Sequence, residues 1–508
     1  MTVQDYSYDV IIAGGGVVGC GIARELSRLD LKIALLEKEP DVGWGASCRN
    51  SGVVHAGYNN TPGTLMARFC VEGNQGFEAL CAELDVPFKR VGKLVVADGP
   101  DEVPALERLK KQGETNGVRG LEMIDGDRVR ELEPHLEHAY AAMYSPNSAI
   151  TSPYLLTIAL AENALANGVD IFLNSRVEKI KRIDPVLSGS ETEGGSAGFI
   201  VHAGGREFRS RILINSAGVQ SAEVSRLAGA DLYTIYPCRG EYYVLDTYAG
   251  ELVHHLVYPV PKPGSGGLGI HLTPTIDGNI LIGPSNEYID FSEDYSVTAP
   301  VMKTLSAEAR SYMPQLNGGF YIRSFAGMRA KQTPPEKGGY YDYVIKEEET
   351  CPGLINLVGI ESPGLTASMP IARYVSGIVR DICERGGRKA GEKPHFKAER
   401  TAPIRFAEQD DEVKAELIAE DPDYGEIICR CEQVTRKEIR QAIENPLGAR
   451  SLNSIKYRSR AMMGRCQGGY CTQRILQILR DEYGVRPDEI ELGISGSWVL
   501  SGGRCDIT

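Results

Sequence analysis

A glycine-rich turn near the start of the chain restricts the fold more than any other feature. The short apolar run Tyr8–Ala13 predicts a buried parallel strand. It leads directly into a G-x-G-x-x-G pattern formed by Gly14, Gly16 and Gly19. Gly14 permits a tight turn, Gly16 lets backbone amides approach a pyrophosphate, and Gly19 lets a helix pack closely on the strand. The helix N-terminus then favours phosphate groups, so the pattern predicts a dinucleotide-binding βαβ unit.

An acidic residue completes this unit. A second apolar run, Lys32–Leu36, ends at Glu37, about 20 residues after Gly14. At that place a carboxylate accepts hydrogen bonds from ribose hydroxyls. The unit by itself does not distinguish FAD from NAD. Because the chain has no second G-x-G-x-x-G unit of comparable quality, we expect no further NAD site.

Length and charge limit the remaining function classes. A chain of 508 residues is too long for one compact core and predicts several structural units. The net charge of −13 argues against nucleic acid or an anionic membrane surface as the main partner. We find no secretory leader and no apolar run of about 20 residues. We therefore expect a cytoplasmic protein without direct membrane insertion, associated with a membrane only through a partner.

Four of the 12 cysteines form two close pairs near the C-terminus, Cys429-x-Cys431 and Cys466-x4-Cys471. Two close thiolate pairs are typical of a four-thiolate metal site. Structural zinc is the alternative, although zinc sites favour two to four residues between paired cysteines. We interpret Cys505 as an incidental tail residue. The remaining cysteines are expected to be small buried hydrophobic residues: Cys20, Cys48, Cys70, Cys81, Cys238, Cys351 and Cys383.

Two later segments extend the nucleotide site. Asn215–Gly218 ends a predicted strand, and Leu354–Ser368 reads as a strand, a glycine-rich turn and a helix start. With these segments, the chain from Tyr8 to about Glu384 resembles the D-amino-acid-oxidase-like (DAO) superfamily of FAD enzymes. The resemblance implies FAD as cofactor. It also implies the following FAD-binding residues: Gly14, Gly16, Gly19, Glu37, Lys38, Ser47, Asn50, Ser51, Val177, Ala217, Gly218, Gly359, Gly364, Leu365 and Thr366.

The resemblance implies an α/β fold in which two domains are interleaved. The Rossmann-like FAD-binding domain would comprise residues 1–90, 150–230 and 325–385, and an antiparallel-sheet substrate domain residues 91–149 and 231–324. The polar run 188–198 is expected to be a hairpin tip or surface loop. A basic stretch followed by a charged helical one predicts a linker over residues 386–424. A small, mainly helical domain would occupy residues 425–508.

The segment Gly43–Gly57 most resembles L-2-hydroxyglutarate dehydrogenases and oxidases. Glycerol-3-phosphate dehydrogenases share the architecture with less agreement here. Oxidation of an alcohol requires a base for the hydroxyl proton, and a histidine suits this task. We predict His55 as the base, with His271 as the competing candidate. Arg329 is the predicted clamp for a substrate anion, although Ala330 stands where the family usually has proline.

Other polar residues allow two interpretations. Arg239 and Arg323 are either second contacts for the substrate anion or surface ion pairs. The aromatic side chains of Tyr242, Tyr243 and Tyr258 either line the pocket or pack within core strands. The sequence does not choose between these alternatives.

The cysteine pattern resembles the bacterioferritin-associated-ferredoxin-like (BFD-like) [2Fe-2S] domain, with Cys429, Cys431, Cys466 and Cys471 as implied ligands. That domain is also appended to the large subunit of anaerobic glycerol-3-phosphate dehydrogenase. A one-electron carrier beside a flavin implies a dehydrogenase with an electron-accepting partner or carrier. The leading hypothesis is oxidation of a small anionic 2-hydroxy acid similar to L-2-hydroxyglutarate. The alternatives are a glycerol-3-phosphate dehydrogenase, an amino- or imino-acid dehydrogenase, and a non-catalytic electron-transfer subunit.

Overall fold

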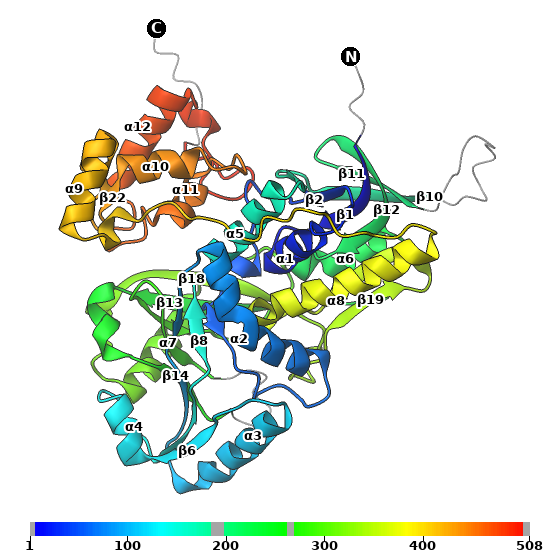
Figure 1. Cartoon of the computed structure of the whole chain (residues 1–508). Helices are drawn as coiled ribbons and strands as arrows, with labels where there is room; N and C mark the ends of the chain where they lie inside the picture. The colour runs from blue at the N-terminus through cyan, green and yellow to red at the C-terminus, as the bar shows by residue number, and fades with distance from the viewer. Residues whose placement is uncertain (1–5, 184–197, 262–268, 501–508) are drawn as a thin grey trace, which may run out of the picture.

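The computed structural model describes residues 6–183, 198–261 and 269–500. One eight-stranded sheet contains the glycine-rich turn (Figure 1). Its central strand, β1 (Ser7–Ala13), pairs in parallel with β2 (Ile33–Leu36) on one side and β12 (Arg206–Asn215) on the other. Strands with few polar residues suit this position because both faces of a parallel sheet are covered. The other strands are β9 (Asp170–Phe172), β10 (Val177–Ile183), β11 (Gly198–Ala203), β19 (Val344–Glu348) and β20 (Cys351–Val358).

Helices cover this sheet and create the largest core cluster. α1 (Val17–Leu26) packs between α5 (Pro153–Ala166) and α8 (Gly364–Arg385), and α8 also packs on α2 (Leu65–Leu84). α6 (Ser221–Leu227) packs against β20. β10 and β11 pair antiparallel, as a hairpin requires; the tip predicted at 188–198 lies outside the described residues except for Gly198.

A nine-stranded sheet forms the second layer. Its strands are β5 (Lys93–Ala97), β6 (Glu122–Asp125), β7 (Ala141–Ser145), β13 (Tyr236–Leu245), β14 (Leu256–Pro259), β15 (His271–Pro274), β16 (Ile280–Gly283), β17 (Glu287–Tyr288) and β18 (Tyr321–Lys331). β18 pairs antiparallel with β13 along its length. The domain boundary predicted at residue 325 therefore falls inside a strand of this second sheet, because backbone pairing continues to Lys331.

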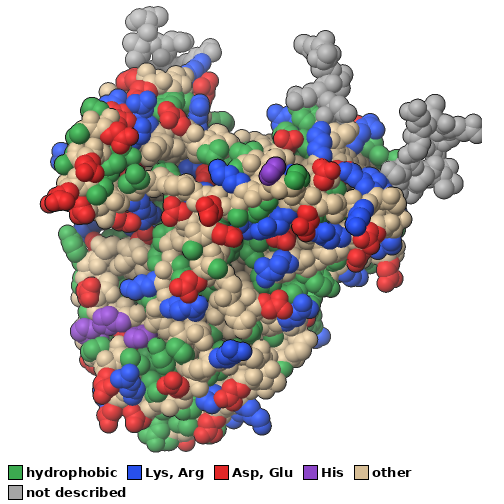
Figure 2. Space-filling model, in the orientation of Figure 1, with side chains coloured by type: hydrophobic (Ala, Val, Ile, Leu, Met, Phe, Trp, Pro, Cys, Tyr) green, Lys and Arg blue, Asp and Glu red, His purple; other side chains and the backbone are tan. Residues whose placement is uncertain are grey.

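Three helices lie around the second sheet: α3 (Val103–Thr115), α4 (Gly126–Leu132) and α7 (Ala299–Tyr312). A small sheet of β3 (Val53–Val54), β4 (Phe88–Arg90) and β8 (Ala149–Thr151) joins the two parts. On the face shown in Figure 2, acidic and basic side chains are interspersed over the surface. Within the described residues, no helix is both long enough and apolar enough to cross a membrane.

The segment after α8 lies in extended form against the first layer. The backbone carbonyl of Ala398 accepts hydrogen bonds from Arg24 of α1 and Asn163 of α5. The segment leads to a separate small core with its own helices. The elements of this core are β21 (Ile427–Cys429), β22 (Val434–Thr435), α10 (Arg436–Ile443), α11 (Leu452–Ser459) and α12 (Cys471–Tyr483). α9 (Asp411–Glu420) precedes them and packs in a smaller cluster with Phe406 and Tyr424. The predicted α/β fold with a mainly helical C-terminal part is confirmed.

Candidate active site and cluster site

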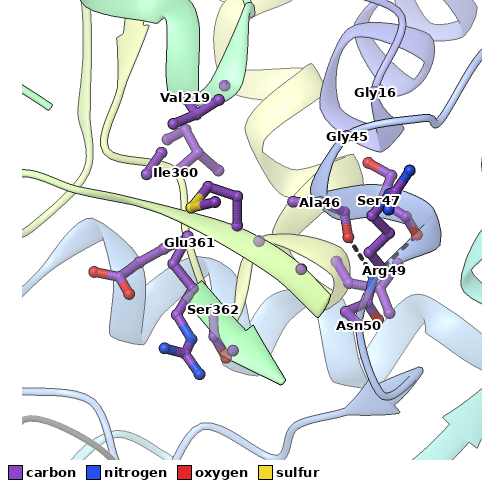
Figure 3. A pocket seen from close by; sticks show the side chains of 18 of the residues that line it. Gly16, Gly45, Ala46, Ser47, Arg49, Asn50, Val219, Ile360, Glu361 and Ser362 are labelled. Carbon is purple, nitrogen blue, oxygen red and sulfur yellow. Dashed lines mark hydrogen bonds between the residues drawn. The ribbon is translucent and has the colours of Figure 1, made fainter. Parts of the chain in front are cut away.

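A cavity of about 650 Å³ lies between the two large sheets. Figure 3 shows two of its walls: the segment Gly45–Asn50 on one side and Val219 with Ile360–Ser362 on the other. The cavity collects most of the predicted site residues from distant parts of the chain. Those lining it are Gly14, Gly16, Glu37, Lys38, Ser47, Asn50, Ser51, His55, Val177, Ala217, Gly218, His271, Arg329, Gly364 and Leu365.

The glycine-rich turn has the geometry that its spacing predicts. Gly14 has a φ of +107°, and a Cβ there would lie 2.6 Å from the Ser216 carbonyl oxygen. A Cβ on Gly19 would lie 2.0 Å from the Gly14 carbonyl oxygen. The turn thus places bare backbone against the cavity at the start of α1. This arrangement fits a bound pyrophosphate.

The Glu37 carboxylate forms the neighbouring part of the cavity wall. It accepts hydrogen bonds from the backbone N–H of Gly15 at 2.6 Å and of Glu39 at 3.0 Å. Burial raises the pKa of Glu37 to about 7 although both amides oppose the shift. An acceptor held at the end of β2 beside the turn fits a ribose.

Three predicted cofactor residues lie outside the cavity wall. Gly19 packs inside the turn, and Gly359 has a φ of +72° beside the Gln332 side chain. Thr366 is buried, and its Oγ1 accepts the backbone N–H of His55 at 3.0 Å. Sequence spacing indicates that such residues lie near a cofactor. It does not distinguish the residues that line the cavity from those that support them.

His55 follows β3 and reaches into the cavity. Its Nε2 lies 3.3 Å from Ser362 Oγ, another residue of the cavity wall. Its Nδ1 lies 3.3 Å from the Nζ of Lys93, on the other side of the ring. Burial, followed by the charges of Lys93 and His271, holds the pKa of His55 well below its usual range. The imidazole is therefore neutral at pH 7, as a general base must be.

His271 also lines the cavity, on β15 as the hairpin pattern predicts. Its ring stacks on Tyr258 with the ring centroids 3.5 Å apart. It is buried, with only 5% of its surface exposed. Stacking on Tyr258 holds the orientation of this ring.

Arg329 lies in the cavity wall on β18. Its guanidinium donates hydrogen bonds to Asn286 Oδ1 at 2.9 Å and to the Ser285 carbonyl at 2.8 Å. No salt bridge joins Arg329 to a carboxylate among the described residues. Ala330, at the position where the family usually has proline, pairs with Pro237 of β13, and β18 continues through this segment.

The two other arginines have structural partners. Arg239 is 4% exposed, and its guanidinium forms salt bridges with three carboxylates, those of Glu241, Glu287 and Asp294. Arg323 is exposed and donates to Gln467 Oε1 at 3.2 Å. Neither residue lines the cavity.

The three tyrosines with two possible interpretations differ in their surroundings. Tyr242 and Tyr258 line the cavity, whereas Tyr243 stacks on Tyr321 with ring centroids 4.4 Å apart, beside a hydrophobic core cluster of the second sheet. The two interpretations of these aromatic residues therefore apply to different members of the set.

Of the four C-terminal cysteines, Cys429 lies on β21, Cys431 in the turn after it, Cys466 in the turn before α12, and Cys471 at the start of α12. Cys429 and Cys471 are buried and hydrogen-bonded to each other, and Cys431 and Cys466 are exposed and likewise paired. The Cys471 thiol lowers the pKa of Cys429 to about 6. Among the described residues, no three His, Cys, Asp or Glu side chains surround a single-ion position.

Backbone amides converge on the same sulfurs. Burial opposes ionisation of Cys466, but the N–H of Tyr470, the Cys431 thiol and the amides of Gly468 and Gly469 together lower its pKa. Four converging thiols with N–H donors around them fit an iron–sulfur cluster, whose sulfurs accept such hydrogen bonds.

Comparison with known proteins identifies the larger part of the chain. The family model described as FAD dependent oxidoreductase (DAO) matches residues 9–378. The chain belongs to the DAO family. A second model, described as BFD-like [2Fe-2S] binding domain, matches residues 427–481. This DAO enzyme therefore has FAD and a [2Fe-2S] cluster as cofactors, and both cofactor predictions are confirmed.

Three proteins similar to this DAO enzyme are named for glycerol phosphate or L-2-hydroxyglutarate. A glycerol 3-phosphate dehydrogenase of Caloramator mitchellensis is 38% identical over 97% of this chain and 98% of its own. An L-2-hydroxyglutarate dehydrogenase of Arabidopsis thaliana is 33% identical over 74% of this chain and 84% of its own. A solved L-alpha-glycerophosphate oxidase from Mycoplasma pneumoniae with FAD bound is 28% identical, with a TM-score of 0.69, and covers 78% of this chain and 99% of its own.

Sequence reasoning missed two charged residues of the DAO enzyme's site. Lys93 is buried behind His55 although it lies in a strand of apolar residues. Glu361 lines the cavity and forms a buried salt bridge with Lys331, 3.3 Å between Nζ and Oε2. The sequence signal for Lys93 is a charged residue next to a fully apolar run, in GKLVVA.

Proposed function

We propose that this DAO enzyme is a dehydrogenase that oxidises sn-glycerol 3-phosphate. The observation that carries the proposal is the extent of similarity to the glycerol 3-phosphate dehydrogenase of Caloramator mitchellensis. That similarity extends over 97% of the chain, through both the cavity and the four cysteines. The substrate class also suits the cavity, which holds a neutral imidazole and an arginine without a carboxylate partner in the described part of the chain.

Two side chains divide the work on the substrate. His55 accepts the hydroxyl proton at Nε2, the nitrogen on the cavity side. Arg329 binds the phosphate with its planar guanidinium, which is already oriented by Asn286 and the Ser285 carbonyl. FAD, when bound, supplies a hydride acceptor. The cavity-lining residues of the glycine-rich turn, with Glu37, would hold its pyrophosphate and ribose.

The four thiols would hold the [2Fe-2S] cluster, which carries single electrons. We propose that a partner subunit or carrier receives them, because a flavin that reduced oxygen directly would not need this second centre. Exposed Cys431 and Cys466 mark the side of the cluster site that is accessible from outside.

L-2-hydroxyglutarate is a second candidate substrate. It is favoured by the Arabidopsis relative, which is 33% identical over 74% of the chain. Both candidates present a secondary hydroxyl and an anionic group, so His55 and Arg329 would act in the same way. The candidates differ in the anion that Arg329 would bind.

Anaerobic mixing of the holoenzyme with each candidate tests the proposal. We expect flavin bleaching within seconds with sn-glycerol 3-phosphate, and slower or no bleaching with L-2-hydroxyglutarate and L-proline. His55→Asn should slow bleaching by roughly 10²- to 10⁴-fold because the base is lost. The exposed His138→Asn is the matched control and should bleach at the wild-type rate. Fast bleaching by proline that is insensitive to His55→Asn would instead indicate an amine dehydrogenase.

A further inference from the structure

Lys93 is a buried lysine that forms no salt bridge with a carboxylate among the described residues. It begins β5 and is 1% exposed. Its Nζ lies 3.3 Å from His55 Nδ1 and 4.0 Å from the centre of the Tyr258 ring. Burying an ammonium group without a paired charge is costly, so the neutral amine is favoured at this position.

The protonation state of this amine determines which nitrogen of His55 can act as a base. A neutral imidazole has one N–H donor and one acceptor. If Nζ is an ammonium group, it donates to Nδ1, the ring proton is on Nε2, and Nε2 cannot act as a base. If Nζ is a neutral amine, its lone pair can accept from Nδ1–H, and in that tautomer Nε2 keeps its lone pair. Nε2 is the nitrogen that faces Ser362 and the large cavity.

We propose that Lys93 is a positioning residue that acts through His55 as a neutral amine: it holds the tautomer with an unprotonated Nε2 and receives the Nδ1 proton during the reaction. This inference rests on the proposed function. The substrate O–H bond breaks and Nε2–H forms, while Nδ1–H breaks and Nζ–H forms. His55 is neutral before and after, and Lys93 gains the positive charge. The hydride of the substrate carbon leaves with its electron pair to FAD.

A second cavity gives this proton a way out. It has a volume of about 70 Å³, with both His55 and Lys93 in its wall. His55 and Ser362 line both cavities, whereas Lys93 lines only this smaller one. The exposed residues Thr61 and Tyr341 also line it, so it reaches the surface. Water entering there would reach Lys93 and restore the neutral amine.

The pH dependence has a definite sign. Burial lowers the pKa of Lys93 to about 7, partly opposed by the Cys70 thiol. The amine form, and with it the competent tautomer, therefore becomes more populated as the pH rises through about 7. The titratable groups that face the Lys93–His55 pair are Tyr58, Cys70, Tyr258 and His271.

Two substitutions of Lys93 separate the proposed role from simple packing. In wild-type holoenzyme, the rate of flavin bleaching by sn-glycerol 3-phosphate should rise roughly tenfold per pH unit below pH 7 and then level off. Lys93→Met removes the amine at similar volume; it should abolish this rise near pH 7 and lower the plateau about 10-fold. Lys93→Arg stays protonated, donates to Nδ1 and should lower the plateau by about 100-fold. The matched control is Lys456→Met, another buried lysine, on α11, which should keep the rise.

A wild-type rise that persists in Lys93→Met, or a Lys93→Arg plateau equal to wild type, would overturn the proposal. A substrate-independent measurement separates it from the proposed function. In ¹⁵N-histidine-labelled holoenzyme at pH 8, assigned by comparison with His55→Asn, His55 should be protonated at Nδ1 in wild type and at Nε2 in Lys93→Arg. The same tautomer in both proteins contradicts the role of Lys93, whatever the substrate. The expected tautomers without any bleaching by the phosphate would contradict only the proposed substrate.

Discussion

At the scale of single residues, Glu37 connects cofactor binding to stability. Its folded-state pKa of about 7 lies above the ordinary value of 4.5 because the carboxyl group is buried. A carboxyl group with a raised pKa stabilises the folded chain below its unfolded pKa, and this contribution is lost as the pH rises through the folded pKa. FAD-free protein should therefore lose roughly 3 kcal/mol of this contribution between about pH 4.5 and pH 7.

Glu37→Gln cannot ionise, so the difference in stability between the variant and wild type should change with pH. We expect the FAD-free variant to gain stability relative to wild type from pH 5 to pH 8, measured by thermal unfolding at each pH. The same substitution should weaken FAD binding at pH 8, because ribose loses a charged acceptor. The exposed Glu107→Gln serves as control. A constant difference between Glu37→Gln and wild type across this range would contradict the assigned burial cost.

The sequence predicts individual residues where their chemistry depends on local spacing. Gly14, Glu37 and the paired cysteines belong to short patterns with a fixed physical purpose, and they meet as expected. Lys93 could not be found in this way. Its role depends on contact with His55, which lies on a different segment, and a lysine beside an apolar run is equally compatible with a position at the surface.

At the scale of elements, the contact between α2 and α8 supports His55. A Cβ on Gly73 of α2 would lie 2.0 Å from the Thr366 carbonyl oxygen of α8. Thr366 Oγ1 in turn accepts the backbone N–H of His55 at 3.0 Å. The absence of a side chain at Gly73 thus lets the helices approach and places the hydroxyl that holds the His55 backbone.

Gly73→Ala should push these two helices apart. We expect a loss of about 1–3 kcal/mol of stability from overpacking, together with slower flavin bleaching as His55 moves with Thr366. Gly76→Ala is the matched control on the same helix, because Gly76 is exposed and a Cβ there has no neighbour within 4 Å. That control should instead gain about 0.5–1 kcal/mol. Thermal unfolding and bleaching rates of both variants test this, and equal effects of the two substitutions would refute it.

Helices and strands were predictable where the local sequence also marks where the element begins and ends, as in Tyr8–Ala13. The run around Arg329 shows the limit of this approach. Family spacing suggested a domain boundary at residue 325, but β18 begins at Tyr321 and continues to Lys331 because it pairs with β13. Strand partners that are as distant in the chain as Cys238 and Arg329 leave no local signal in the sequence.

At the scale of the whole molecule, the cysteine-containing part docks directly onto the wall of the flavin cavity. α11 contacts Trp44, which precedes the cavity-wall segment Gly45–Asn50. The Tyr457 ring of α11 lies edge-on to the Trp44 ring, with the centroids 5.8 Å apart. The neighbouring Arg458 forms a buried salt bridge with Asp41, with Nη2 and Oδ1 3.1 Å apart. This pair joins residues 417 positions apart in the chain. Composition therefore predicted a linker between the two parts but not how the two parts contact each other.

This buried pair should control electron transfer between the two centres. Arg458→Met leaves the Asp41 carboxylate buried without its partner, which costs about 3–5 kcal/mol and loosens the docking. His55 and Arg329 lie elsewhere in the cavity, so substrate should still bleach the flavin at the wild-type rate, while reduction of the cluster becomes slower. Stopped-flow absorbance after anaerobic mixing with substrate follows both steps.

Two further variants separate the lost contact from the unpaired charge. The double variant Asp41→Asn/Arg458→Met removes that charge and should recover part of the cluster rate, because the buried carboxylate no longer opposes docking. Arg486→Met, which breaks only exposed pairs with Asp488 and Glu489, is the control and should change neither rate. Cluster reduction at the wild-type rate in Arg458→Met would show that this docking contact does not set the distance between the centres.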